Sequence, residues 1–179
     1  GLSDNQIEFL EKYVKPRENI KTLTFQAARD CNEVIIKHNK YQPNSLPLSI
    51  YDQLENTKKS LKKIQDIVGS YRNIGIENNN YYPTGAYDIC TSAEFLISCF
   101  EDIGLHLLFD VAHAIVTCTN KNLSFTDYSQ KLLKNMECKQ VHLCEPSFSY
   151  SNKLPKAIDS HNLPSPKSTQ DTLNIMRKW

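Results

Sequence analysis

Hydrophobic and polar positions along the chain follow two patterns in turn, and these predict alternating helices and short strands. Apolar residues at helical spacing predict helices over residues 2–14, 49–69, about 91–103, 126–136 and 168–178. Short apolar runs between them predict strands near residues 20–25, 73–77, 105–110, 139–143 and 157–159. Residues 31–47 combine weak periodicity with Asn and Pro, so we expect a long loop there.

Local signals mark several helix ends. Thr91 and Glu94 have the spacing of a capping box and predict the start of one helix, and Gly104 is placed to cap its other end. Thr126 is the predicted start of the next helix.

The alternation of elements predicts an α/β fold of parallel strands with crossover helices. The run from Leu105 to Asp110 is apolar at successive positions, as expected of a strand buried on both faces. A doubly wound sheet and a (β/α) barrel both fit, and the GxGxxG fingerprint of dinucleotide-binding sheets is absent from the sequence. About five strands are predicted where a closed barrel has eight, so residues 1–179 are expected to form one partial TIM-barrel-like domain.

Charge and composition narrow the function classes. Lys and Arg number 21 against 20 Asp and Glu, a formal charge of +1, which gives no electrostatic argument for binding nucleic acid or an anionic membrane. The sequence shows neither an apolar run of about 20 residues nor a signal-peptide pattern. Six cysteines without a C-x-x-C pair argue against a zinc knuckle and are expected to be free thiols in the cytoplasm.

Carboxylate and imidazole side chains recur where consecutive predicted strands end. These six residues are Glu77, Asp110, His113, His142, Asp159 and His161. In a parallel (β/α) architecture the strand ends share one face, the face that carries active sites. A single strand-end Asp is more often a helix cap, but six such residues at successive strand ends predict a metal site. His38 lies in the polar loop and His106 lies inside a strand, so both are assigned ordinary structural roles.

The mixture of imidazole and carboxylate suits divalent first-row metals such as Fe, Mn or Zn, whereas carboxylates alone would suit Mg or Ca. Six candidate ligands exceed one tetrahedral site, so two or three ions are conceivable. The spacing alone does not choose among iron, zinc and manganese.

The sequence resembles the multinuclear non-heme iron-dependent oxidases of the xylose isomerase-like TIM-barrel superfamily. The resemblance covers most of the chain, and its motifs are IGIENNNYYPTGAYD at 74–88, HLLFDVAHAIV at 106–116, QVHLCEP at 140–146 and AIDSHNLP at 157–164. It implies two or three iron ions held by the six strand-end residues. It also implies dioxygen-dependent modification of residues, often cysteines, in a ribosomally made peptide that a partner protein commonly presents. Tyr81, Tyr82 and Tyr87 would then either line the peptide groove or pack within the loop.

Departures from the family pattern keep other functions open. Gln26 stands where the family typically has a histidine, and no counterpart of the first and last barrel strands is found between Gly1 and Trp179. The chain is therefore expected to be a fragment, a part completed by a second polypeptide, or a degenerate member. One alternative function is an endonuclease IV-like or sugar isomerase-like metalloenzyme, although four arginines are few for a DNA-binding enzyme. Another is a non-catalytic binding module.

Overall fold

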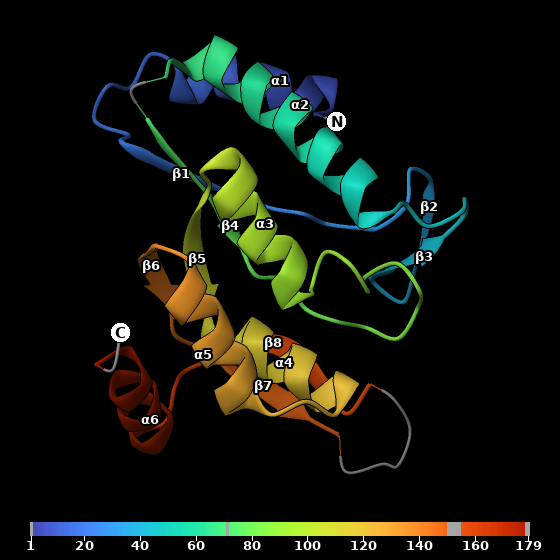
Figure 1. The fold of residues 1–179 in the computed structure, drawn as a ribbon, viewed down its shortest axis with the longest axis vertical. Helices are drawn as coiled ribbons and strands as arrows, with labels where there is room; N and C mark the ends of the chain where they lie inside the picture. The colour runs from blue at the N-terminus through green and yellow to red at the C-terminus, as the bar shows by residue number, and fades with distance from the viewer. Residues whose placement is uncertain (1, 71, 150–154, 178–179) are drawn as a thin grey trace.

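The centre of the molecule is a parallel sheet of four strands in the order β1-β4-β5-β6 (Figure 1). The strands are β1 (Thr22–Gln26), β4 (Asn73–Glu77), β5 (His106–Asp110) and β6 (Cys138–His142). The computed structural model describes residues 2–70, 72–149 and 155–177. The parallel order and the helical crossovers confirm the predicted α/β class, and the four strands lie side by side in chain order, as strands do in a (β/α) barrel.

Helices cover one face of this sheet. α2 (Ile50–Val68), α3 (Ala93–Ile103) and α5 (Phe125–Asn135) pack in sequence over it, as Figure 1 shows. Their apolar sides form one core with Leu107 and Phe109 of the central strand β5, both almost fully buried. The chain starts with α1 (Asp4–Phe9) and the π-helical turn η1 (Leu10–Val14), and α6 (Pro166–Met176) follows the last strand.

Side-chain caps fix the helix starts, and two of them differ from the prediction. Ser92, not Thr91, caps α3 by accepting the backbone N–H of Phe95 at 3.2 Å. Thr91 is unavailable because its hydroxyl donates to the carbonyl of Tyr87 at 2.6 Å. Ser124, not Thr126, caps α5.

The ends of the last helix and of α3 are also defined locally. α6 begins two residues before the predicted position 168 because Ser165 caps it, and the predicted end at residue 178 lies outside the described residues. Gly104 ends α3 in the left-handed conformation, with φ 81°, as predicted.

The predicted loop over residues 31–47 instead contains a β-hairpin. β2 (Val34–Lys37) pairs antiparallel with β3 (Lys40–Pro43), and His38 and Asn39 form the two-residue turn with φ of 51° and 57°. Positive φ at both turn residues matches the right-handed twist of the strands, and Asn tolerates this conformation well. The Asn was the signal for a tight turn, but His38 and the neighbouring prolines concealed it.

A helix for which the pattern gives no prediction begins directly at the end of β5. α4 (Val111–Lys121) is capped by Asp110, whose Oδ1 accepts the backbone N–H of His113 at 2.9 Å. No polar linker separates strand from helix, which is why the sequence pattern does not reveal the boundary. The direct transition places His113 in the first helical turn beside Asp110.

The fifth predicted strand does not join the parallel sheet. β8 (Ala157–Asn162) pairs antiparallel with β7 (Glu145–Phe148) in a separate two-stranded sheet, the β7–β8 hairpin. This hairpin packs on α4 rather than extending the sheet beyond β6. The parallel strands therefore number four in the described residues, not about five.

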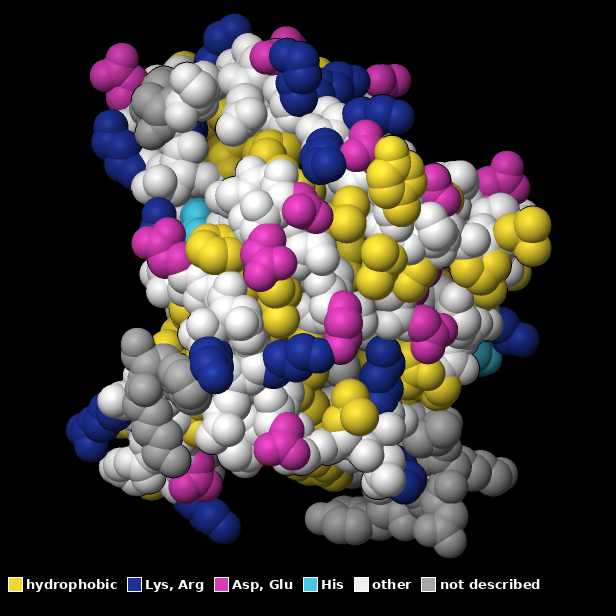
Figure 2. Space-filling view, viewed as in Figure 1, with side chains coloured by type: hydrophobic (Ala, Val, Ile, Leu, Met, Phe, Trp, Pro, Cys, Tyr) yellow, Lys and Arg dark blue, Asp and Glu magenta, His cyan; other side chains and the backbone are white. Residues whose placement is uncertain are grey.

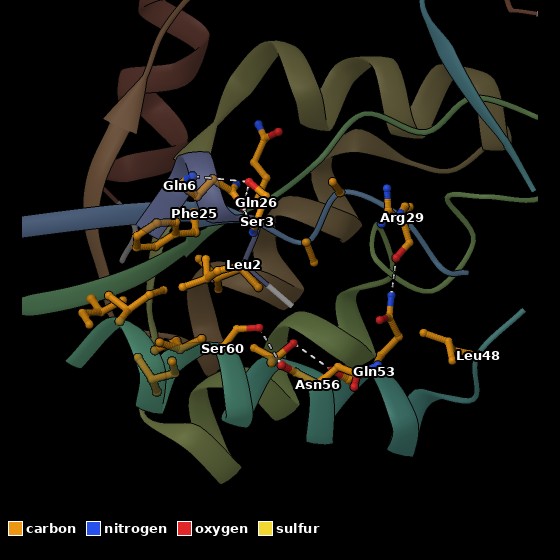
Figure 3. A pocket seen from close by; sticks show the side chains of 18 of the residues that line it. Leu2, Ser3, Gln6, Phe25, Gln26, Arg29, Leu48, Gln53, Asn56 and Ser60 are labelled. Carbon is orange, nitrogen blue, oxygen red and sulfur yellow. Dashed lines mark hydrogen bonds between the residues drawn. The ribbon is translucent and has the colours of Figure 1, made fainter. Parts of the chain in front are cut away.

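A cavity of about 540 Å³ lies between the sheet and α2. Phe25 and Ile76 from the strands and Asn56 and Ser60 from α2 are among its lining residues, as Figure 3 shows for three of them. On the face shown in Figure 2, Lys and Arg side chains alternate with Asp and Glu side chains among the described residues. This face gives no support to a nucleic-acid surface.

Gly75 of β4 permits a close strand-to-strand contact. It is the register partner of His106, and a Cβ at Gly75 would lie 2.5 Å from His106 Nε2. We predict that Gly75→Ala lowers the free energy of unfolding by about 1–3 kcal/mol, the usual effect of overpacking a core. Urea denaturation checks this, and Gly75→Ala combined with His106→Ala should be less destabilised than the sum of the single variants.

Burial also controls the protonation of His106. In the folded chain the pKa of this imidazole is lowered, mainly by burial and to a smaller extent by the positive charge of Lys139. The unfolded chain therefore binds more protons as pH falls, and the contribution to stability is lost below the ordinary histidine pKa of about 6.5. We predict that the unfolding free energy of His106→Gln falls less than that of the native chain between pH 7 and pH 5. Equal slopes would contradict this assignment.

Candidate metal centre

The six predicted residues come together in two groups of possible ligands. The sheet group consists of Glu77, Asp110 and His142, and the hairpin group consists of His113, Asp159 and His161. Within each group, one ligand atom per residue lies within 4.8 Å of the others.

The sheet group is positioned by the ends of three neighbouring parallel strands. Asp110 and His142 are register partners on β5 and β6, and Glu77 ends β4 on the other side of β5. His142 Nδ1 lies 3.6 Å from both Glu77 Oε1 and Asp110 Oδ2. The carboxyl ends of a parallel sheet thus bring these side chains together, as predicted from the pattern.

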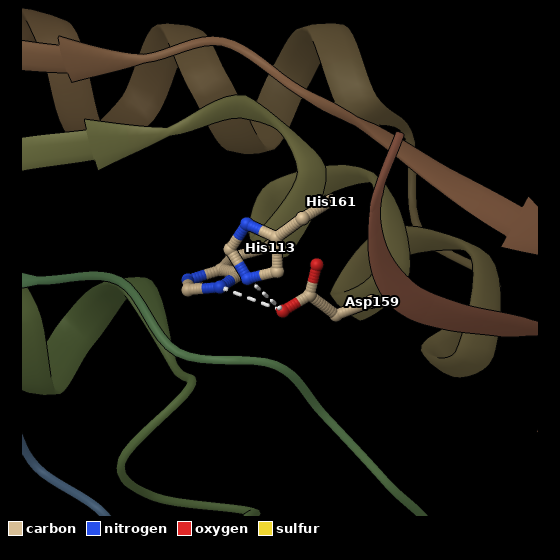
Figure 4. Close-up of side chains that lie close together, drawn as sticks. All are labelled: His113, Asp159 and His161. Carbon is tan, nitrogen blue, oxygen red and sulfur yellow. Dashed lines mark ion pairs between the residues drawn. The ribbon is translucent and has the colours of Figure 1, made fainter. Parts of the chain in front are cut away.

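The hairpin group is assembled differently, because only Asp159 and His161 come from β8 (Figure 4). Asp159 Oδ2 lies 3.3 Å from His113 Nε2 and 3.0 Å from His161 Nε2. His161 has a φ of 48°, a left-handed conformation that is uncommon for a residue with a Cβ. Non-glycine residues in such conformations concentrate at functional sites.

His113 lies between the two groups. Its Nδ1 is 2.8 Å from the backbone carbonyl of Asn78, and its Nε2 is 4.0 Å from Asp110 Oδ2. Because a carbonyl oxygen can only accept, Nδ1 carries the proton in this contact, and Nε2 is the ring nitrogen that faces Asp159. A backbone carbonyl that orients an imidazole in this way is a common second-sphere feature of histidine metal ligands.

The three carboxylates, Glu77, Asp110 and Asp159, have histidines, and no Lys or Arg, as ion-pair partners among the described residues. Asp110 Oδ2 and Asp159 Oδ1 are buried and have no hydrogen-bond partner among the described protein atoms. Buried polar atoms are normally paired, so the donor set and these two oxygens fit a bound metal ion.

Three asparagines support the site, and the predicted ligand set did not include them. Asn78 is fully buried and bonds the backbone of Asp110 twice, donating to its carbonyl at 2.9 Å and accepting its N–H at 2.8 Å. Asn80 donates to Asp159 Oδ2 at 3.4 Å. Asn120 of α4 bonds the start of β8. The run of three asparagines after Glu77 was a signal for the first two, whereas nothing in the sequence marked Asn120.

The thiol of Cys144 and the phenol of Tyr82 each contact one residue of the hairpin group. Cys144 Sγ lies 3.7 Å from His161 Nδ1, and burial together with the carboxylates of Asp110, Asp159 and Glu77 raises the pKa of this thiol to about 11. The hydroxyl of Tyr82 accepts the backbone N–H of Asp159 at 3.3 Å.

The other two tyrosines of the loop take packing positions. Tyr87 is buried and Tyr81 lies under the ammonium group of Lys121, 4.5 Å from the ring centroid.

The other positions singled out in the sequence are Gln26, His38 and His106. Gln26 ends β1 and is the register partner of Glu77, so it lies at the same strand ends as the sheet group. His38 occupies the exposed turn of the β2–β3 hairpin, and His106 is buried inside β5.

No helix in the described part of the chain is both long and apolar enough to cross a membrane.

The fold and the site define an α/β protein with one group of possible metal ligands at the carboxyl ends of its parallel strands and a second on α4 and the β7–β8 hairpin. The sequence model of the RiPP precursor modification enzymes MbnB/TglH/ChrH matches residues 36–177, which is most of the chain. The chain therefore belongs to this family, whose members modify ribosomally made precursor peptides.

Two other comparisons add little. No curated protein matches the chain. A solved structure of a D-tagatose 3-epimerase-like protein is 16% identical, with a TM-score of 0.46, over 98% of this chain and 82% of that chain. At that level the likeness carries no argument.

Metal binding to these groups is expected to stabilise the folded chain. The carboxylates are brought together only by folding, so a metal ion binds the folded chain and not the unfolded chain. We predict that a divalent ion at a concentration of 100 times its Kd raises the unfolding free energy by about 2.7 kcal/mol. Thermal unfolding of the metal-free chain with and without Mn²⁺, under nitrogen, measures this. The Asp110→Asn, Asp159→Asn double variant should lose the increase, and an undiminished increase in that variant would contradict the assignment.

Proposed function

We propose that this chain is an iron-dependent oxidase that modifies residues, most often cysteines, of a ribosomally made peptide. Family membership supports the peptide substrate. The observation that carries the metal part of the proposal is the pair of ligand groups, each of which includes an aspartate with a buried oxygen that has no hydrogen bond among the described residues. The sequence resemblance supports iron over zinc or manganese and dioxygen as the oxidant.

In this proposal the sheet group holds one ion and the hairpin group holds a second. The sheet group, Glu77, Asp110 and His142, offers two carboxylates and one imidazole. The hairpin group offers one carboxylate, from Asp159, and two imidazoles. Both sets fall within the ligand types that suit non-heme iron. Bound iron would supply the redox chemistry that couples dioxygen to oxidation of the peptide.

The residues of the chain itself divide into a buried floor and an open rim. The side chains of Asp110 and His113 are 0% and 4% exposed, whereas those of His142 and His161 are 55% and 68% exposed. We therefore propose that the peptide approaches over the two exposed histidines. Burial would keep water away from the Asp110 carboxylate. Its Oδ1 accepts the backbone N–H that caps α4, so Oδ2 is the oxygen left to bind an ion.

Tyr82 and Cys144 border the rim in this proposal. The Tyr82 hydroxyl and the Cys144 thiol both contact residues of the hairpin group, at Asp159 and His161. Tyr82 would therefore limit the space available to the peptide beside Asp159. We assign His142 and Asp159 to metal binding rather than to free acid and base roles.

We predict that the chain, reconstituted with Fe²⁺ without oxygen, holds two or more iron ions and consumes dioxygen when a cysteine-containing peptide is added. Asp110→Ala with His113→Ala should lose the iron and the oxygen uptake, because both residues lie on the buried floor. Elemental analysis, an oxygen electrode and the mass of the peptide are the measurements. The peptide is used in large excess because the resemblance implies a partner protein that presents it.

A matched control is His38→Asn, which keeps a residue suited to the hairpin turn and removes a histidine outside both groups. It should retain the iron and the activity. Selective retention of zinc or manganese without oxygen uptake would favour a hydrolase or isomerase of the same superfamily. Absence of metal from the native chain would contradict the proposal.

A further inference from the structure

The two ligand groups differ in what holds them in place. The residues of the sheet group are fixed by parallel pairing with β5 as the central strand. Asp159 and His161 lie on β8, which among the described residues pairs only with β7 and has no ladder to the four-stranded sheet. Another element must therefore set where the β7–β8 hairpin lies relative to His113.

Asn120 of α4 makes this connection with its side-chain amide. Its Oδ1 accepts the backbone N–H groups of Lys156 and Ala157 at 2.8 and 3.0 Å. Its Nδ2 donates to the backbone carbonyls of Ala157 at 3.0 Å and Tyr81 at 2.9 Å. All four hydrogen-bonding positions of the amide are used, and Asn120 is almost fully buried.

The pattern of these bonds resembles strand pairing. Asn120 bonds both the N–H and the carbonyl of Ala157, as a neighbouring strand residue would, two positions before Asp159. The same amide reaches Tyr81, in the loop that continues from Glu77 through the three asparagines. α4 also carries His113 in its first turn and Asn120 near its end, so one helix bears both the third ligand and the hairpin's attachment.

We propose that Asn120 is a positioning residue that holds Asp159 and His161 in register with His113, and so controls metal binding by the hairpin group alone. This inference rests on the proposed function, because it assumes that the hairpin group binds an ion. Asn120 does not touch the ligand atoms; it acts through the backbone of β8. Removal of such a supporting contact typically weakens metal binding 10- to 100-fold.

The test compares Asn120→Asp with the native chain in two backgrounds. Asp is nearly isosteric with Asn and keeps the acceptor toward Lys156 and Ala157, but it places an oxygen opposite the carbonyls of Tyr81 and Ala157. In a His142→Ala background, which disables the sheet group, Asn120→Asp should raise the Kd for Fe²⁺ about tenfold or more. In an Asp159→Asn background, which disables the hairpin group, the Kd should stay within about twofold.

Hydrogen exchange supplies a readout independent of metal. The backbone amides of Glu145, of residues 147–148 and of residues 157–162 should exchange faster in Asn120→Asp, while those of β4 and β5 stay unchanged. The control is Gln53→Ala, which removes another buried amide that donates to the carbonyl of Arg29 and to Asp30. It should leave both Kd values and hairpin exchange unchanged. If Asn120→Asp fails to fold, Asn120→Ser, which keeps a small hydroxyl in place, takes the same test.

The outcomes separate this inference from the proposed function. Native chain that binds no Fe²⁺ would overturn both. If the native chain binds Fe²⁺ but Asn120→Asp raises the Kd equally in the two backgrounds, the role of Asn120 is overturned and the proposed function stands. The same holds if Asn120→Asp raises the Kd in neither background. Weakening confined to the His142→Ala background, together with faster hairpin exchange, would establish the positioning role.

Discussion

The structure depends on bringing three carboxylates together where little solvent reaches them. Glu77, Asp110 and Asp159 converge without a Lys or Arg partner among the described residues, and two of their oxygens are buried with no hydrogen bond. Buried anions repel one another and lose hydration, so this arrangement is costly unless a cation joins it. The convergence of these carboxylates is the feature of the fold that fits the metal site proposed above.

Asp110 combines a structural role with a place in the sheet group. One carboxylate oxygen begins α4 by capping it, while the other faces the histidines. Asn78 fixes the backbone of Asp110 through two hydrogen bonds and orients His113 through its own carbonyl. Strand end, helix start and ligand orientation are thus decided by a few adjoining residues, and a change at any of them would disturb the others.

Membership of the peptide-modifying family gives these groups a context. The family supplies the class of substrate, and the geometry supplies a buried floor with an exposed histidine rim. The two groups also differ in mechanical support, because one is built into the sheet and the other is carried by a hairpin that packs on α4. Metal binding and hairpin position are expected to be coupled for the second group only.

The sequence by itself determined the α/β class and four of the five predicted strands, and its strand-end pattern predicted that Glu77, Asp110 and His142 lie together. Those features depend on local periodicity and on the rule that parallel strands end at one face. Only the tertiary structure decided that residues 157–162 pair antiparallel with β7, and that Asn120 ties them to α4. The pattern also did not predict the β2–β3 hairpin, because its turn depends on positive φ at His38 and Asn39. It did not predict the direct passage from β5 into α4, because no polar linker separates the two elements. Long-range hydrogen bonds join residues about 40 positions apart, and no local pattern encodes such a distance.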